Sequence, residues 1–316
     1  MLDTLLNPYY MQVASFILIN IMLGLSVYIT LSSGQLSLGS VGFMAIGAYT
    51  TALLTTNFNT PIIVGVLAGT IISGILGLLI GIPALRLKGV FLAIATLGFG
   101  EIVRVFLVNL ESVTNGAIGI SGIPQIGNQI LAFFENFGFS PEAIGLQKNQ
   151  FVFLSIFLLL LVIVIIMTAF FIRQKNSRVG RAFSAINMDE DAASSMGVNV
   201  TYYKVLSFTQ GAIISGFAGA LYAHVMSYIS PGDFSYHRVV EVLTYTVFGG
   251  SEVVIGAVFG AISLTLLPEL LRVISEYRYM IYGLLMVAMM YYRPQGIIDQ
   301  HMIRWFKHKF RRQKGA

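Results

Sequence analysis

The stretch FVFLSIFLLLLVIVIIMTAFFI, residues 151–172, decides the fold class of this chain. It holds 22 residues without a charged side chain, and a helix needs about 20 apolar residues to cross the roughly 30 Å hydrocarbon core of a membrane. Of the 316 residues, 56% are hydrophobic and 10% are charged, whereas soluble domains carry charge on about a quarter of their residues. The sequence therefore predicts an all-α, polytopic transmembrane helical bundle.

Eight further apolar runs predict that the bundle has about eight to ten membrane segments. With the first stretch, the candidates are 12–31, 41–56, 62–84, 90–108, 151–172, 205–226, 239–248, 253–271 and 278–292. The runs 41–56, 239–248 and 278–292 are shorter than a full crossing, so we expect broken or re-entrant helices there. We interpret residues 1–298 as one membrane domain, followed by a basic tail at 299–316.

Basic residues predict which side of the membrane each loop faces. Loops on one side hold 14 of the 19 Lys and Arg residues, loops on the other side hold four, and one lies inside a segment. Because short cytoplasmic loops are enriched in Lys and Arg, we predict that the loop 173–204 and the tail 299–316 are cytoplasmic. Nine crossings then place the N-terminus outside and make residues 109–150 an outer, partly membrane-dipping cap. This placement of the net charge of +5 argues against nucleic-acid binding.

Small residues spaced by four predict close helix packing. They recur at Gly65, Gly69, Ser73, Gly77 and Gly81, then at Gly211, Ser215 and Gly219, and again at Gly256 and Gly260. This spacing keeps them on one slowly drifting helix face, where two backbones can approach closely. We expect them to pack helices rather than to bind a ligand.

Motifs of enzymatic chemistry are missing from the sequence. The dipeptide Gly-Lys never occurs, so there is no P-loop for ATP, and there is no G-x-S-x-G motif. The four His residues form no pair at metal-ligand spacing, and there is no Cys. We therefore expect no catalytic residue, no metal site and no cofactor bound by this chain.

One pair of opposite charges lies within a predicted segment. Glu101 and Arg104 are three residues apart, so both can share one helix face and neutralise each other. Charged side chains within membrane helices face protein or water rather than lipid. We predict a buried ion pair that joins adjacent helices; the alternative, a proton relay, would need further acidic residues in line with the pair.

Two glycine-containing breaks are candidate parts of a solute pathway. They are SSGQLSLGSVGF at 32–43 and TNGAIGISG at 114–122, with the candidate residues Gln35, Ser37, Gly39, Thr114, Asn115 and Gly116. Non-helical backbone at membrane depth is tolerated only where protein or a water-filled cavity satisfies its polar groups, and transporters often build solute sites from such breaks. An ordinary interfacial loop is the alternative for both stretches.

The polar stretch GRAFSAINMDEDAASSMGVNV, residues 180–200, lies between two long apolar runs. It predicts one helix of about ten residues that involves Asn187, Asp189, Glu190, Asp191, Ala192, Ala193, Met196 and Gly197. Asn187 is the predicted N-cap, the acidic residues fall in the first turn, and Gly197 suits the position after the C-cap. The two alanines and the methionine form a small apolar face. A helix this short is unstable alone in water, so it must pack on its own membrane domain or on a separate cytoplasmic subunit.

Several motifs, in order, resemble the M-type permease subunits of branched-chain amino acid ABC transporters. They are SGQLSLGSVGFMAIGAYTTALL, KGVFLAIATLGFGEIVRVF, TNGAIGI, GRAFSAINMDEDAASSMGVNVTYYK, YISPGDFS and YRPQGII, and the likeness covers roughly residues 13–298. In the loop, the family's acid-Ala-Ala-x-x-x-Gly order is kept as Asp191-Ala192-Ala193 with Gly197. One departure is TNG at 114–116, where the family more usually has Thr-Gly-Gly.

The resemblance implies one subunit of an importer in the bacterial inner membrane. The other subunits would be a homologous H-type permease, two ATP-binding subunits that carry ATP and Mg, and an extracytoplasmic solute-binding protein. A short helix in the loop 173–204 would seat in a cleft of the ATPase and drive alternating access. Related permeases serve urea and short-chain amides, so the solute class stays open, and a self-sufficient secondary transporter is the alternative mechanism.

Overall fold

The computed structural model describes residues 7–84, 86–136 and 147–270, together with 277, 280–281, 283–284, 287–288, 291 and 296–298. Its long helices are α2 (Pro8–Ser32), α3 (Ser40–Asn57), α4 (Ile62–Ala84), α5 (Val90–Asn109), α8 (Lys148–Lys175) and α11 (Val200–Met226). Most of the predicted segment 278–292 and all of the tail 299–316 lie outside the described residues.

Shorter elements connect or follow the long helices. They are α6 (Glu111–Thr114), η1 (Gly116–Ile118), β1 (Ile120–Ser121), α7 (Ile126–Asn136), α9 (Arg178–Met188), α10 (Glu190–Ser195), β2 (Tyr228–Ile229), η3 (Pro231–Phe234), α12 (Tyr236–Gly249) and α13 (Val254–Leu270). Within the described residues, α2, α4, α5, α8 and α11 are each long and apolar enough to cross a membrane. The predicted class, an all-α polytopic bundle, is confirmed.

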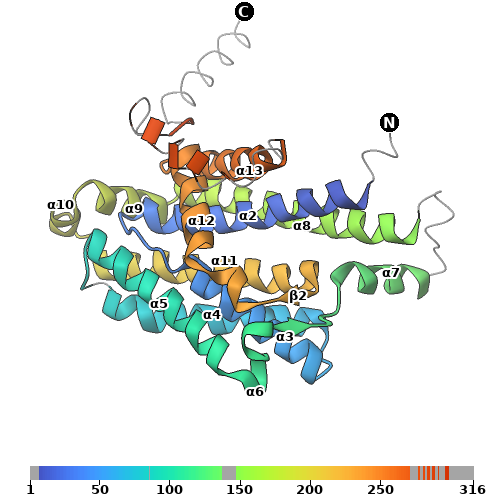
Figure 1. Cartoon of the computed structure of the whole chain (residues 1–316). Helices are drawn as coiled ribbons and strands as arrows, with labels where there is room; N and C mark the ends of the chain where they lie inside the picture. The colour runs from blue at the N-terminus through green and yellow to red at the C-terminus, as the bar shows by residue number, and fades with distance from the viewer. Residues whose placement is uncertain are drawn as a thin grey trace, which may run out of the picture.

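Helix α11 lies at the centre of the bundle. It packs against α2, α3 and α4, while α8 lies beside α2, and the α12–α13 hairpin packs on α2 (Figure 1). Figure 1 also shows α9 and α10 at one end of the bundle and α7 at the opposite end. The polar loop and α7, which is part of the predicted outer cap, therefore lie at opposite ends of the long helices (Figure 1).

Small residues allow the central helices to touch along their backbones, as their spacing predicts. A Cβ added at Gly69 of α4 would lie 2.7 Å from the carbonyl oxygen of Gly47 in α3, and one at Gly77 would overlap Ala212 of α11. In α13, a Cβ at Gly260 would overlap the backbone of α12. No side chain fits in these positions, so the glycines set the distance between the helices.

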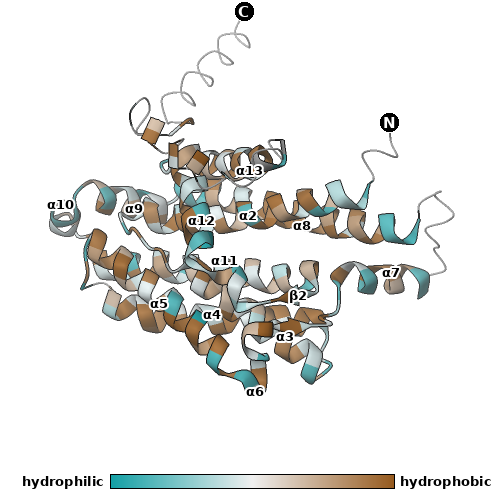
Figure 2. Cartoon of the chain, in the orientation of Figure 1, coloured by the Kyte–Doolittle hydropathy of each residue, from teal (hydrophilic) through white to brown (hydrophobic). Residues whose placement is uncertain are grey.

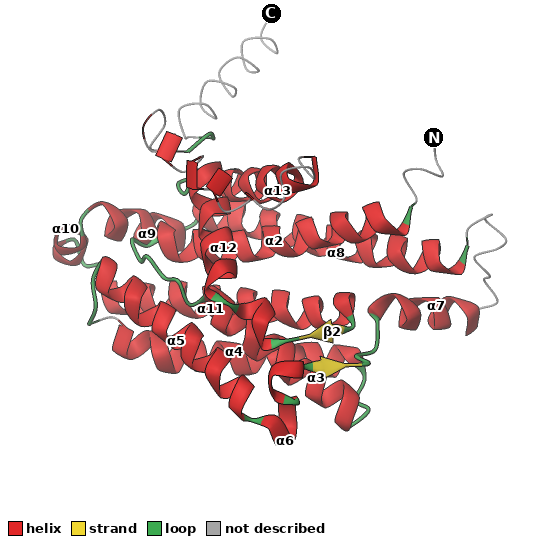
Figure 3. Ribbon diagram, in the orientation of Figure 1, coloured by secondary structure: helices red, strands yellow, loops and turns green. Residues whose placement is uncertain are grey.

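The segment after α5 is tied to the end of α11 by a short antiparallel ladder that the sequence did not predict. Ile120 pairs with Ile229, and Ser121 pairs with Tyr228 (Figure 3). Buried His224 reinforces the connection, because its Nδ1 lies 2.8 Å from the carbonyl oxygen of Pro124 and its Nε2 lies 3.0 Å from Thr51 Oγ1. A carbonyl oxygen only accepts, so Nδ1 carries the hydrogen.

Candidate functional site

Residues 178–195 form two short helices instead of the single helix predicted from Asn187. Ser177 caps α9, and Asn187 lies inside that helix. Asp189 then begins α10, because its carboxylate accepts hydrogen bonds from the amides of Asp191 and Ala192, both at 2.9 Å. The prediction of Asn187 as the N-cap was therefore wrong. Asp189 has the extended backbone of an N-cap and an oxygen in reach of the free amides, whereas Asn187 has neither.

The end of α10 follows the prediction for Gly197. This residue has φ +83°, its amide donates to the Ser194 carbonyl at 3.0 Å, and the amide of Val198 donates to the Ala193 carbonyl at 3.1 Å. These two bonds form a Schellman motif, for which glycine is the favoured residue.

The predicted apolar face of α10 is divided between the interior and the surface. Ala193 is buried, whereas Ala192 is exposed and Met196 is 86% exposed. Met188, at the end of α9, is 88% exposed as well. The two methionines flank the acidic turn and form an exposed apolar pair at the end of the bundle, which we call the methionine tip.

Glu190 fixes α10 to two other elements through ion pairs. Its carboxylate lies 2.5 Å from Nζ of Lys204 at the start of α11 and 3.6 Å from Nζ of Lys88 in the loop before α5. Partial burial would by itself raise the pKa of Glu190, but the contacts with the two lysines hold that pKa below its ordinary value. The carboxylate is therefore charged at neutral pH and joins α10 to both elements.

The same region contacts the break between α2 and α3. A Cβ at Gly34 would lie 3.2 Å from Asn187 Oδ1, so the break and α9 are in direct contact. Ser207, one turn after Lys204, lies 2.6 Å from the hydroxyl of Ser33 and donates to Gln35 Oε1 at 3.3 Å. The break, the loop before α5 and α10 line a common cavity of about 260 Å³. The ion pairs of α10 and the break thus share one polar region.

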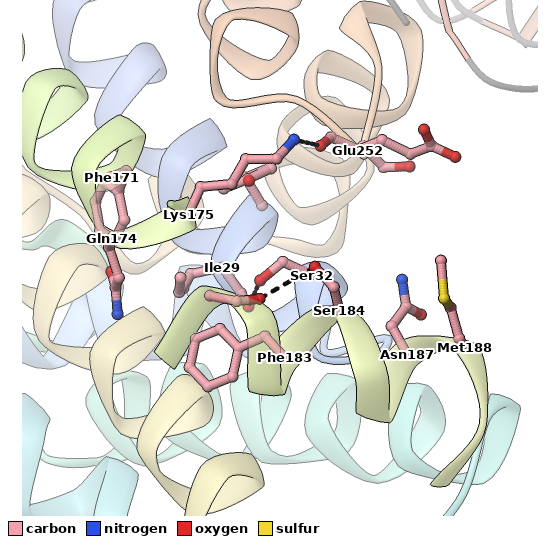
Figure 4. A pocket seen from close by; sticks show the side chains of 13 residues that line it. Ile29, Ser32, Phe171, Gln174, Lys175, Phe183, Ser184, Asn187, Met188 and Glu252 are labelled. Carbon is pink, nitrogen blue, oxygen red and sulfur yellow. Dashed lines mark hydrogen bonds between the residues drawn. The ribbon is translucent and has the colours of Figure 1, made fainter. Parts of the chain in front are cut away.

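A larger hollow of about 340 Å³ lies on the other side of α9 (Figure 4). In Figure 4, Lys175 from the end of α8 reaches the backbone carbonyl of Glu252, while Ser184 and Asn187 of α9 line the opposite wall. Buried Phe183 anchors α9 beside the hollow. Helix α9 is therefore packed on the bundle through Ala182, Phe183 and Ile186, and the hollow lies beside this contact.

The candidate pathway residues fall into two groups that this structure keeps apart. Gln35 and Ser37 are buried in the break, and the break meets α5 where the Leu38 amide donates to Thr96 at 2.9 Å; Gly39 caps α3. Thr114 is buried beyond the far end of α5, where it donates to the Leu107 carbonyl at 2.6 Å. Asn115 and Gly116 follow it with φ of +58° and +56°. Thirteen residues of α5 separate the groups, a distance of about 20 Å at 1.5 Å per residue.

Glu101 and Arg104 form the predicted ion pair, but the prediction that it is buried between helices is wrong for this chain. Arg104 Nε donates to Glu101 Oε1 at 2.9 Å. The Arg104 side chain is 31% exposed and the Glu101 side chain 48%, because the pair lies on the open face of α5. Three-residue spacing sets the pairing, but it does not set which way the shared face points.

Comparisons with known proteins agree with the motifs. The family model for the permease component of branched-chain amino acid transport systems matches residues 9–290. The chain belongs to this family. No solved structure matches it.

The permease is also similar to curated proteins. It is 36% identical over 299 residues to the high-affinity branched-chain amino acid transport system permease protein LivM of Salmonella typhimurium, covering 91% of this chain and 69% of that protein. The identity to LivM of Escherichia coli K12 is 36% over 301 residues, with the same coverage. The permease protein LivH of E. coli K12 is 26% identical over 200 residues, 62% of this chain and 61% of LivH.

The permease does contain a buried ion pair, which the sequence did not single out. Arg238 Nη1 donates to Glu241 at 3.1 Å, and their side chains are only 11% and 9% exposed. Arg238 also donates to Asn20 of α2 at 2.6 Å and lies over the ring of Phe16. Glu241 lies inside the predicted apolar run 239–248, and Arg238 directly precedes that run. Their three-residue spacing was the available signal, but it equals that of the exposed pair on α5.

Proposed function

We propose that this permease is a membrane subunit of an ATP-binding-cassette importer for branched-chain amino acids. Its partners would be a homologous H-type permease, two ATP-binding subunits that carry ATP and Mg, and an extracytoplasmic solute-binding protein. The family match supports the transport role, and the LivH likeness supports a second, related permease. The chain would bind no cofactor and would move solute by alternating access.

The proposed location is the bacterial inner membrane, with the N-terminus outside and the C-terminus cytoplasmic. In this orientation the segment 178–195 and the loop that holds Lys88 face the cytoplasm. The positions of α9–α10 and α7 at opposite ends of the bundle support this orientation (Figure 1). The basic residues that flank α9 support it too, because cytoplasmic loops are enriched in them.

The methionine tip and the ion pairs of Glu190 together carry the proposal that α9–α10 couple the permease to an ATPase. Met188 and Met196 point outward, and methionine adapts well to a partner's surface. Glu190 connects the base of the tip to α11 and to the loop before α5. A docked ATPase that moves the tip would therefore move two elements that enter the membrane bundle.

Reconstitution with and without the ATP-binding subunits tests the proposal. We expect ATP-dependent leucine uptake from the complete complex and none from the permease alone. The double variant Met188→Asp, Met196→Asp should lose the ATPase on co-purification while it still reaches the membrane. The matched control is Phe58→Asp, an exposed apolar residue after α3 (71% exposed).

Two results would overturn the proposal. Gradient-driven uptake by the permease alone would identify a secondary transporter. ATP-dependent uptake of urea or short-chain amides, without uptake of leucine, would correct the solute class.

A further inference from the structure

The open face of α5 differs from the open faces of the other exposed membrane helices. Only 22% of the most apolar window is buried in α5, and the same fraction is buried in α8. The core of α8, Phe151–Ile172, and the whole of α4 contain no charged residue, whereas the open face of α5 carries Glu101 and Arg104. Figure 2 shows teal, hydrophilic positions that interrupt the brown of α5.

The ion pair lies within α5, more than one turn from either end of the helix. Glu101 is eleven residues from Val90 and Arg104 is five residues from Asn109, which corresponds to about 16 Å and about 8 Å along the helix. Long basic side chains can reach the nearer membrane surface from such depths. Arg104 instead turns back toward Glu101, one turn closer to the middle. The pair therefore stays within the span of α5, and Arg104 does not extend toward the nearer end of the helix.

Lipid is excluded as the neighbour of this face by the charges themselves. Ionisable side chains inside membrane segments face protein or a water-filled cavity, because hydrocarbon solvates them poorly. No described residue covers the pair, since both side chains stay exposed. Something beyond the described residues, either further protein or water with a solute, must therefore be in contact with it.

We propose that the open face of α5 lines the solute pathway, and that Glu101 and Arg104 bind the two charged groups of a zwitterionic amino acid. This inference rests on the proposed function. The Arg104 guanidinium would hold the solute carboxylate in a bidentate contact, and the Glu101 carboxylate would accept hydrogen bonds from the solute ammonium. The second permease would supply the opposite wall.

The surroundings of the pair suit an aliphatic side chain. Ile94 and Val105, seven residues before and four residues after Glu101 and therefore on its side of the helix, are 61% and 44% exposed. Between them lies Gly98, where an added Cβ would meet nothing within 4 Å. Apolar surface on either side of an open position can take the side chain of leucine, isoleucine or valine while the charges hold the other end.

Binding at such a site would be weak, which is what a pathway requires. An exposed ion pair contributes little to stability, so opening it costs little. A zwitterion would replace one internal pair with two contacts to the solute, and the pair would close again after release. Conduction needs a site from which the solute leaves readily.

A thiol-labelling experiment tests whether this face is wet. The chain has no cysteine, so Gly98→Cys introduces a single thiol into the permease of the reconstituted complex. A membrane-impermeant methanethiosulfonate reagent should label it, and saturating leucine should slow the labelling at least threefold. Val162→Cys on α8, at a position 55% exposed in this chain, is the control and should stay unlabelled. No labelling at position 98 in a complex that transports leucine, or cross-linking of that cysteine to the second permease without labelling, would overturn the proposal.

A charge reversal separates solute binding from a structural role. The double variant Glu101→Arg, Arg104→Glu keeps an ion pair but exchanges the two charges along the pathway. We expect leucine uptake to fall at least tenfold while co-purification with the ATPase stays unchanged. Arg104→Lys, which keeps the charge but loses the bidentate contact, should lower uptake less.

Uptake at the wild-type rate by the reversed pair would show that only the pair itself matters, and would overturn the proposal. If the reversed complex does not assemble, the labelling at Gly98→Cys decides. Failure of the proposed function would appear separately, as absence of ATP-dependent leucine uptake by the wild-type complex.

Discussion

Replacing Glu190 with glutamine should loosen α10 from the rest of the permease. The substitution removes the charge that pairs with Lys204 and Lys88 but keeps the size of the side chain. Lys204 Nζ has no other ion-pair partner among the described residues, so its ammonium is left nearly buried and unpaired. Lys204→Met acts differently, because it removes the buried charge itself and leaves Glu190 near Lys88.

The burial of the pair sets the size of the effect. Removing one partner costs about 3–5 kcal/mol for a fully buried ion pair and about 0–1 kcal/mol for an exposed one. The Lys204 side chain is 10% exposed and the Glu190 side chain 29%, so the pair lies between these limits. We expect Glu190→Gln to destabilise α10 by about 2 kcal/mol and Lys204→Met by about 1 kcal/mol. These values correspond to about 30-fold and about fivefold changes in the opening equilibrium.

Native-state hydrogen exchange of the permease in detergent measures this opening. The amides of Ala193 and Val198 are bonded only while α10 is formed, so their exchange should accelerate by the factors given above. Glu135→Gln is the control, since its ion pair with Lys148 is exposed, and it should leave α10 unchanged. The reasoning is refuted if Glu190→Gln leaves exchange unaltered, or if its effect simply adds to that of Lys204→Met in the double variant.

Three further outcomes follow from the structure. Gly216→Ala should destabilise the permease by about 1–3 kcal/mol, measured as a lower unfolding temperature, because its methyl group would overlap a side chain of α4. Gly98→Ala should leave the unfolding temperature unchanged, and equal effects of the two substitutions would contradict the packing described. Glu241→Gln should destabilise the permease by about 3 kcal/mol in the same measurement, and Arg238→Met with Glu241→Leu by less, since no buried charge is left unpaired. Because the pKa of Glu190 is lowered in the folded protein, its ion pairs stabilise α10 above the ordinary glutamate pKa and are lost only as pH falls through the lowered value. The exchange rate of the α10 amides, corrected for the intrinsic pH dependence of exchange, should therefore be constant near neutral pH. A change in this rate between pH 6 and 8 would show that a group other than Glu190 controls the opening of α10.

Features that depend on local chain properties could be predicted from the sequence. The length of the apolar runs gave the long helices, and the spacing of Gly69 and Gly77 gave the close packing of α4. The role of Gly197 at the end of α10 could be predicted, because the residue after a helix often has a left-handed backbone, which glycine adopts most easily. The break at residues 33–39 could be located for a similar reason, since its polar and glycine residues interrupt an apolar pattern.

The tertiary structure alone decided which charges are buried. Glu101–Arg104 and Arg238–Glu241 have the same spacing and both form ion pairs, yet only the second is covered, because α12 packs on Asn20 of α2 while α5 stays open. The β1–β2 ladder likewise joins residues 107 and 109 positions apart, which no local pattern records. The sequence determines which residues of a helix lie on the same face. Which neighbour covers that face depends on how distant segments pack.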